Sequence, residues 1–295
     1  MTVAETSALR VEEAEQGLRL DVWLRARFPG WSRRRIARAL EEGRVRVDGQ
    51  RARKGQILCA GAEVAVFGPP DTPENLRPVP EPTALLVLHQ DDALVAVHKP
   101  AGMPSHPLRA AERGTLANAL VAQFPECADA SEDPREAGLC HRLDGGTSGV
   151  LLAARTRDAH RAVREAFRTG EVEKEYLALV AGEARAQVIR LPVGDRAMPA
   201  ETRVEPVERL GAFTLIRCAT RGGQRHQVRV HLAGAGHPVA GDPLYGGQPV
   251  EGLEGFFLHA SLLRLRHPRD GAPLEIRAPL PDDREALLAR LRGER

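Results

Sequence analysis

Short apolar runs separated by polar turns dominate the chain beyond residue 84. Runs of this length, bounded by glycine, proline and polar residues, are typical of buried strands. Two further segments, residues 116–124 and 158–168, have the pattern of helices. Residues 84–295 are therefore predicted to form one α+β domain with a mixed, largely antiparallel sheet, and its strands are expected at residues 85–88, 94–97, 149–154, 176–180 and 213–218.

A smaller helical pattern precedes this domain. A short helix is predicted around Trp23 and ends at Pro29 and Gly30, and a second helix, from residue 33 to residue 42, has Ser32 as its N-cap. The periodicity of the second helix turns its apolar residues inward, namely Ile36, Ala37 and Leu40. The same periodicity leaves a set of arginines largely on the outer surface, namely Arg33, Arg34, Arg35 and Arg38.

A hairpin completes this module, because Asp48-Gly49 is a strong signal for a two-residue turn between strands. Together with the alternating valines near residues 64–66, it predicts a small α/β module over residues 18–67. Residues 1–17 are polar and acidic, and we expect them to be disordered. Residues 68–83 hold six prolines and almost no apolar residue, which predicts an extended, semi-rigid linker.

The charge of the chain is unevenly distributed. Residues 18–67 contain 12 Arg/Lys against 5 Asp/Glu, a net charge of +7, whereas the whole chain carries +2 and the remainder therefore carries −5. A basic module attached to a slightly acidic body is typical of a polyanion-binding appendage.

Composition excludes several classes of protein. No apolar run approaches the roughly 20 residues of a membrane span, and the N-terminus lacks the apolar core of a secretory signal, so we expect a cytoplasmic protein. The cysteines are widely spaced and predict neither a zinc site nor a disulfide framework: Cys59, Cys127, Cys140 and Cys218. With no ligand cluster and no glycine-rich nucleotide loop, neither a metal nor a cofactor is expected.

One segment stands out chemically, the HRLDGGTSG stretch at residues 141–149. It places a single carboxylate, Asp144, in a turn of glycines and hydroxyls that a bulky ligand can approach closely. Residue types alone favour a simpler interpretation, a turn at the entry to a strand whose aspartate caps local amides.

HRLD followed two residues later by TSG resembles the catalytic signature of the RluA-type ribosomal large-subunit pseudouridine synthases. The resemblance covers about residues 85–285, and residues 18–67 resemble an S4 RNA-binding domain, a common N-terminal attachment in this family. Further stretches occur in the family's order: HKPAG at residues 98–102, HP at 106–107, KEYLALV at 174–180, HQVRVHL at 226–232, GHP at 236–238, GDPLYG at 241–246, LHA at 258–260, HP at 267–268 and PLP at 279–281.

The resemblance implies a catalytic domain of pseudouridine synthase type and a role for each matching residue. Asp144 matches the essential aspartate that acts on the ribose of a flipped-out uridine as the N1 glycosidic bond breaks, after which the uracil turns and rejoins through C5. Flipping the base costs a few kcal/mol, and Arg142 is expected to fill or prop the vacated space. Tyr176 matches a tyrosine that lies against the base, and Arg229 matches an arginine that pairs with the aspartate and orients it.

The sequence departs from the family at one position. Where the family commonly has Gly-Arg-Thr-His-Gln, this chain has Gly-Gln-Arg-His-Gln at residues 223–227, so the arginine is displaced to Arg225. Arg225 is expected to reach the RNA from its shifted place. His226 and His231 flank Arg229, and without a cysteine cluster or HExxH spacing a structural or RNA-contacting role is favoured over a metal site.

The resemblance predicts a monomeric RNA pseudouridine synthase, an isomerase that acts on ribosomal RNA, with 23S RNA favoured and transfer RNA as an alternative. A noncatalytic RNA-binding assembly factor is the runner-up, although it predicts decay of a catalytic signature that is intact here. A glycoside hydrolase would need two carboxylates flanking the bond, and the motif-bearing segments offer one. The target uridine, and the choice between attack on the sugar carbon and removal of a sugar proton, stay open.

Overall fold

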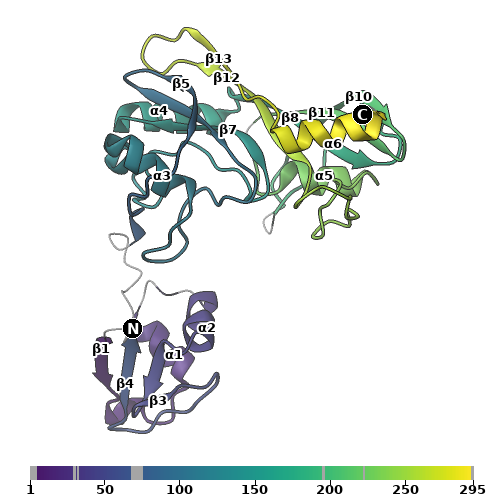
Figure 1. Cartoon of the computed structure of the whole chain (residues 1–295). Helices are drawn as coiled ribbons and strands as arrows, with labels where there is room; N and C mark the ends of the chain where they lie inside the picture. The colour runs from purple at the N-terminus through teal and green to yellow at the C-terminus, as the bar shows by residue number, and fades with distance from the viewer. Residues whose placement is uncertain are drawn as a thin grey trace. The chain divides into compact units, whose positions relative to one another are not determined.

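The computed structural model describes residues 5–28, 31, 33–67, 76–194, 197–221 and 223–293. The chain divides into two compact units, Met1–Asn75 and Leu76–Arg295 (Figure 1). Within the described residues, no helix has the length and apolar character that crossing a membrane requires.

The smaller unit packs two helices, α1 (Leu20–Arg27) and α2 (Arg33–Glu41), with a four-stranded sheet. The strand order is β1-β4-β2-β3, and the bounds are β1 Glu5–Arg10, β2 Val45–Val47, β3 Gln50–Arg51 and β4 Glu63–Phe67. A short 3-10 helix, η1 (Glu13–Glu15), follows β1. Trp23 and Leu24 from α1 are fully buried in the core of this unit.

The local predictions for this unit are largely confirmed. Asp48 and Gly49 both adopt positive φ, 49° and 74°, as the predicted two-residue hairpin turn between β2 and β3 requires. The inward stripe of α2 differs by one residue, because Ala39 is buried and Ala37 is only half-buried. Pro29, Gly30 and the predicted N-cap Ser32 lie outside the described residues.

The prediction of a disordered N-terminus is wrong for residues 5–17. Residues 5–10 form β1, which pairs antiparallel with β4, and Val11 is buried in the core. The hydrogen-bond partners of β1 lie more than 50 residues away in the chain, so local composition does not indicate that this polar segment forms a strand.

The larger unit is built on a nine-stranded sheet with the order β5-β6-β7-β12-β8-β11-β10-β9, and β13 pairs with β12. All its described strand pairs are antiparallel except β7 with β12, which confirms the predicted α+β class. The bounds are β5 Leu86–Gln90, β6 Leu94–Lys99, β7 Ser148–Ala154, β8 Glu173–Ala181, β9 Gln187–Ile189, β10 Thr202–Leu210, β11 Phe213–Arg221, β12 Leu258–Arg266 and β13 Pro273–Arg277.

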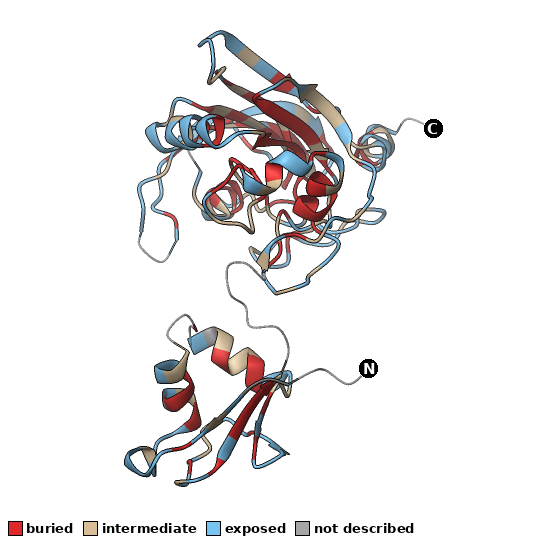
Figure 2. Ribbon diagram, turned by 90° about the vertical axis from the view of Figure 1, so that its left-hand side faces the viewer, coloured by how far each residue is buried: buried red, intermediate tan, exposed pale blue. Residues whose placement is uncertain are grey.

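Helices cover both faces of this sheet, and buried residues line the strands between them (Figure 2). One face packs against α3 (Leu116–Gln123), the short η3 (Pro125–Asp129) and α5 (Gln227–Gly234). The other face packs against α4 (Arg157–Thr169) and α6 (Asp282–Arg292). Successive side chains of a strand point to opposite faces, so Ala178 and Leu179 of β8 enter different cores. This explains why these strands are continuous apolar runs.

The predicted linker extends too far toward the C-terminus. Residues 68–75 lie outside the described part of the chain, but residues 76–83 run against α3. The Asn118 side chain donates to the carbonyl of Val79 (2.8 Å), and the Glu81 amide donates to the carbonyl of Asn118 (3.1 Å). These bonds make the second half of the proline-rich segment part of the larger unit.

Gly149 makes the parallel pairing of β7 with β12 possible. Its φ is +119°, and a Cβ atom there would lie 2.1 Å from the carbonyl oxygen of its partner Ala260. Gly149→Ala should therefore lower the free energy of unfolding by about 1–3 kcal/mol from backbone strain, with the clash adding to this loss. Thermal melting of the full chain measures the effect. Gly145→Ala is the matched control, because a Cβ there meets nothing within 4 Å; equal melting points for the two variants would contradict the prediction.

Candidate active site

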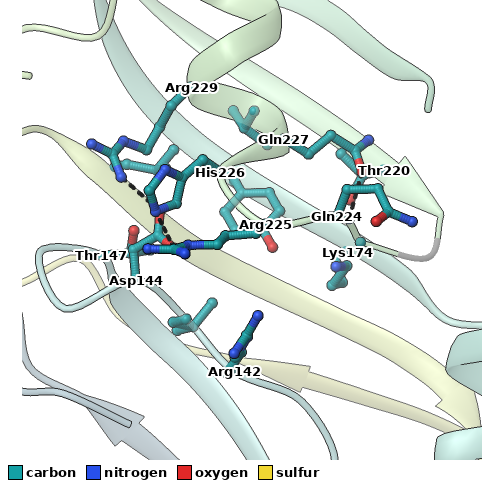
Figure 3. A pocket seen from close by; sticks show the side chains of 15 residues that line it. Arg142, Asp144, Thr147, Lys174, Thr220, Gln224, Arg225, His226, Gln227 and Arg229 are labelled. Atoms are coloured by element: carbon teal, nitrogen blue, oxygen red, sulfur yellow. Dashed lines mark hydrogen bonds and ion pairs between the residues drawn. The ribbon is translucent and has the colours of Figure 1, made fainter. Parts of the chain in front are cut away.

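Residues from distant parts of the chain meet in one pocket of the larger unit (Figure 3). Its empty volume is about 600 Å³, part of which is open to solvent. The lining comes from the loop before β7, from β8, from the end of β11 and from the start of α5. The structure thereby brings together all five residues that the sequence assigned to this domain: Arg142, Asp144, Tyr176, Arg225 and Arg229.

Hydrogen bonds from Lys99, the last residue of β6, fix the turn that carries Asp144. Lys99 is fully buried, and its ammonium donates to the carbonyls of Pro100 (2.8 Å), Met103 (2.7 Å) and Gly145 (3.0 Å). Burial lowers the pKa of Lys99 to about 7, and the nearby negative charge of Asp144 opposes this shift. The residue next to Asp144 is thus tied to the end of β6, so the carboxylate projects from a fixed turn.

Arg229 lies between two carboxylates. Its Nη1 donates to Asp144 (3.0 Å), while its Nε and Nη2 donate to the two oxygens of Asp242 (2.7 and 2.8 Å). Burial would lower the pKa of Arg229, but the hydrogen bonds to Asp242 and Asp144 outweigh burial and raise it. The rings of Phe256 and Tyr245 lie 4.4 and 5.0 Å from the guanidinium carbon.

The two carboxylates differ in exposure. The Asp242 side chain is completely buried, whereas the Asp144 side chain retains 24% of its surface and faces the pocket. A bidentate bond to a buried partner fixes the plane of a guanidinium. Asp242 therefore orients Arg229, and Arg229 in turn orients the one carboxylate of the pair that a substrate can reach.

His226 is a second neighbour of Asp144, and the sequence did not assign it this place. Its Nε2 lies 3.6 Å from the nearer Asp144 oxygen, and its Nδ1 lies 2.9 Å from the hydroxyl of Tyr245. Burial lowers the pKa of His226, and Asp144 opposes the shift, so the ring is largely neutral at neutral pH. The residue has φ +59° at the N-cap of α5, and such strained conformations concentrate at functional sites.

His231 points elsewhere. It is fully buried and bonds through its ring nitrogens to Thr202 (2.8 Å) and to the carbonyl of Leu191 (2.9 Å). His226 and His231 therefore do not face a common point at which both could bind one metal ion. Across the described ranges, no group of three or more His, Cys, Asp or Glu residues is placed to hold a metal ion.

Tyr176 contributes a buried phenol to the pocket. Burial and, secondarily, the charge of Asp144 raise its pKa, so the hydroxyl stays protonated over the physiological range. Arg142 and Arg225 are exposed, in contrast, and lie where the pocket opens. The pocket thus combines a buried aromatic wall with a cationic rim.

The four arginines of the smaller unit are less uniformly exposed than predicted. Arg33 is exposed, but Arg35 and Arg38 are half-buried, and the guanidinium of Arg35 lies 4.9 Å from the centre of the Trp31 ring. The side chain of Arg34 is outside the described part of the chain. An arginine that packs on an aromatic ring is partly buried by it, and the helical periodicity used for the prediction does not reveal such a contact.

Comparisons with known proteins assign the chain. The family model described as RNA pseudouridylate synthase matches residues 93–234, and the S4 domain model matches residues 18–64. A relative from Nitrosomonas europaea, named ribosomal large subunit pseudouridine synthase D, is 36% identical over 309 residues, which cover 98% of this chain and 88% of the relative. The chain belongs to the RNA pseudouridylate synthase family.

Other members of the family agree with this assignment. A Yersinia pestis protein with the same name is 32% identical over 96% of this chain and 94% of its own length. The solved structure of human RNA pseudouridylate synthase domain containing 4 has 26% identity and a TM-score of 0.58, covering 70% of this chain and 93% of that one. The predicted enzyme class, an RNA pseudouridine synthase with an S4 domain, is confirmed, and the noncatalytic and hydrolase alternatives are not supported.

Asp242→Asn tests whether the buried carboxylate orients Arg229 in the candidate active site of this pseudouridine synthase. An amide cannot satisfy two guanidinium donors, and removing one charge of a buried pair typically costs about 3–5 kcal/mol of folding free energy. The melting point should fall, and the single-turnover rate should fall about tenfold or more as Arg229 loses its orientation. Glu165→Gln, which breaks an exposed ion pair with Arg168 on α4, is the control and should change neither quantity. Parent-like behaviour of Asp242→Asn would show that Asp242 does not orient Arg229.

Proposed function

We propose that this pseudouridine synthase isomerises specific uridines of large-subunit ribosomal RNA, 23S RNA in bacteria. The target is supported by relatives named for the ribosomal large subunit, which align at 32–36% identity over 94% or more of this chain. Transfer RNA is the alternative substrate. The observation that carries the chemical proposal is a single pocket-facing carboxylate, Asp144, bonded to a buried and fully oriented arginine.

Asp144 acts on the ribose of a uridine that has left its stack. The N1–C1′ bond breaks, the base turns, the C5–C1′ bond forms, and the proton on C5 is lost while N1 gains one, so no oxidant or reductant is needed. Arg229 stabilises the negative charge of Asp144 and fixes its direction through the 3.0 Å hydrogen bond. An unpaired carboxylate in so enclosed a site would be costly.

Tyr176 forms the wall against which the uracil lies, and its phenol is positioned to assist the transfer of the C5 proton. Arg142, which is exposed at the pocket opening, occupies the space that the flipped base leaves. Arg225 contacts RNA phosphate from the same rim, which compensates for the displaced family arginine.

The smaller unit supplies affinity. The smaller unit, described over residues 5–67, acts as the RNA-binding domain, and the larger unit, which begins at residue 76, acts as the catalytic domain. Arg33, Arg34, Arg35 and Arg38 on α2 contact phosphates, as the net charge of +7 in this segment favours. The pocket with Asp144, Tyr176 and Arg229 is formed within the larger unit alone, and we propose that the enzyme works as a monomer, in the cytoplasm where ribosomal RNA is processed.

Asp144→Asn should abolish the reaction and spare RNA binding. The amide keeps the size of the side chain but lacks the charge and the nucleophilic oxygen. Tritium release from RNA labelled at uracil C5, measured in single turnover with enzyme in excess, should disappear, while the Kd for RNA changes by no more than a few fold. Pseudouridine mapping in cells that lack the gene and carry either form identifies the target. Release at a rate near that of the parent would refute the assignment of Asp144, and a missing modification confined to transfer RNA would refute the ribosomal target.

Removing residues 1–68 should separate affinity from chemistry. Each phosphate contact releases counterions, so log Kd depends on log salt with a slope of about 0.9 per contact on double-stranded nucleic acid. The truncated enzyme should bind RNA more weakly and with a flatter salt dependence, yet turn over bound RNA in single turnover near the parent rate. The control is full-length Asp144→Asn, which should keep the parent slope. An unchanged slope after truncation would place the phosphate contacts in the larger unit.

A further inference from the structure

A buried lysine in the pocket has no role in the scheme above. Lys174 lies on β8, two residues before Tyr176, and its residue surface is only 9% exposed. Among the described residues its ammonium has no hydrogen bond and no ion pair. Its recorded contacts are aromatic, with the nitrogen 5.8 Å from the centre of the Phe167 ring and 6.0 Å from that of Tyr176.

The fold makes room for this ammonium. Gly223 has no side chain, and a Cβ atom there would lie 2.4 Å from the Lys174 nitrogen. Burial lowers the pKa of Lys174 to about 8, so the group is still largely protonated at neutral pH. A buried cation without a partner is costly, and a fold that keeps one at the wall of a pocket is completed by a ligand that brings an acceptor.

The position of Lys174 indicates which part of the substrate it meets. Figure 3 shows Asp144, His226 and Arg229 gathered on one side of the pocket and Lys174 on the other. The ribose belongs at Asp144, so the base extends from there along Tyr176 toward Lys174. The phosphates stay at the opening with the exposed Arg225, because they remain part of the RNA backbone. A lysine that lines the pocket near the Tyr176 ring is therefore placed to meet the base.

We propose that Lys174 is the residue that recognises the flipped uracil, with its ammonium donating a hydrogen bond to a carbonyl oxygen of the base, O2 or O4. This inference rests on the proposed role of Asp144. When the N1–C1′ bond breaks, the electron pair of that bond leaves with N1, and the negative charge spreads over O2 and O4. The bond from the ammonium therefore strengthens as charge develops, which is the condition for lowering the barrier rather than only binding the substrate.

Lys174→Met tests the proposal, because methionine keeps an apolar stem of similar length and removes the donor. Loss of one such donor typically slows catalysis by about 10²–10³. The single-turnover rate of tritium release should fall by about 100-fold, and the Kd for RNA should change by less than about threefold. Arg277→Met, at an exposed position of β13 outside the lining of the pocket, also removes one positive charge and should leave both quantities unchanged.

Replacing a carbonyl oxygen of the target uracil by sulfur gives a second test, because a lysine with a purely structural role would not change the effect of that replacement on the rate. Sulfur is a poorer acceptor than oxygen, so 2-thiouridine or 4-thiouridine at the target should slow the parent enzyme at whichever position the ammonium contacts. In Lys174→Met that thio effect should disappear. Gly223→Ala displaces the ammonium but retains its charge, and it should weaken the same thio effect. This variant replaces Lys174→Met in the experiment if the methionine variant does not fold.

Two outcomes would overturn the inference. Equal thio effects at both positions in parent and variant would show that the ammonium does not touch the base. A weaker Kd with a salt slope reduced by about one, at an unchanged rate, would assign Lys174 to a phosphate. Neither outcome affects Asp144, whereas tritium release by Asp144→Asn would refute the proposed catalysis whatever Lys174 does.

Discussion

The candidate active site depends on one guanidinium shared by two carboxylates. Arg229 comes from α5, Asp144 from the turn before β7 and Asp242 from the loop after α5, and the three side chains meet through bonds of 2.7 to 3.0 Å. Because Asp242 is fully buried and Asp144 is not, the bidentate pair with Asp242 anchors the arginine, and the single hydrogen bond orients the carboxylate that faces the pocket. An accessible carboxylate thereby lies in an enclosed site, and each of the three charges has an opposite partner.

The same constraint explains the surrounding architecture. Arg229, in the first turn of α5, contacts carboxylates from two loops, and the N-cap of this helix, His226, is in the left-handed region with φ +59°. The turn with Asp144 cannot move toward the arginine, because Lys99 ties the carbonyl of Gly145 to the end of β6. Packing, strain and buried hydrogen bonds therefore all fix the distance between one carboxylate and one cation, as catalysis by preorganised charge requires.

Strands β5, β6, β7, β8 and β11 could be predicted from the sequence because each contains a continuous apolar run. Strands β9, β10, β12 and β13 were not predicted, and many positions of β10 and β13 are exposed. The segment of α5 gave no such signal. Val228 and Val230 alternate as in a strand, yet the segment is a helix whose residues are buried on several sides, including Gln227, Arg229 and His231. Tertiary contacts decide the conformation of a helix that is enclosed in this way. The polar strand β1 was missed for a related reason, since its stability comes from β4 across more than 50 residues.

The candidate site, too, could be predicted only in part. Asp144 and Arg229 were proposed from a sequence signature. The contacts of Asp242 and Lys99, and the burial of Lys174, can be recognised only in the three-dimensional structure. Lys174 is the instructive case. A lysine in a charged stretch between Glu173 and Glu175 reads as part of a solvated face, yet the strand period turns it inward while both glutamates reach Arg264 on the other side. The chain thus uses the two faces of one strand to hold opposite charges apart. The Lys174 ammonium, which has no hydrogen bond or ion pair within the described part of the chain, stays available for an acceptor on the substrate.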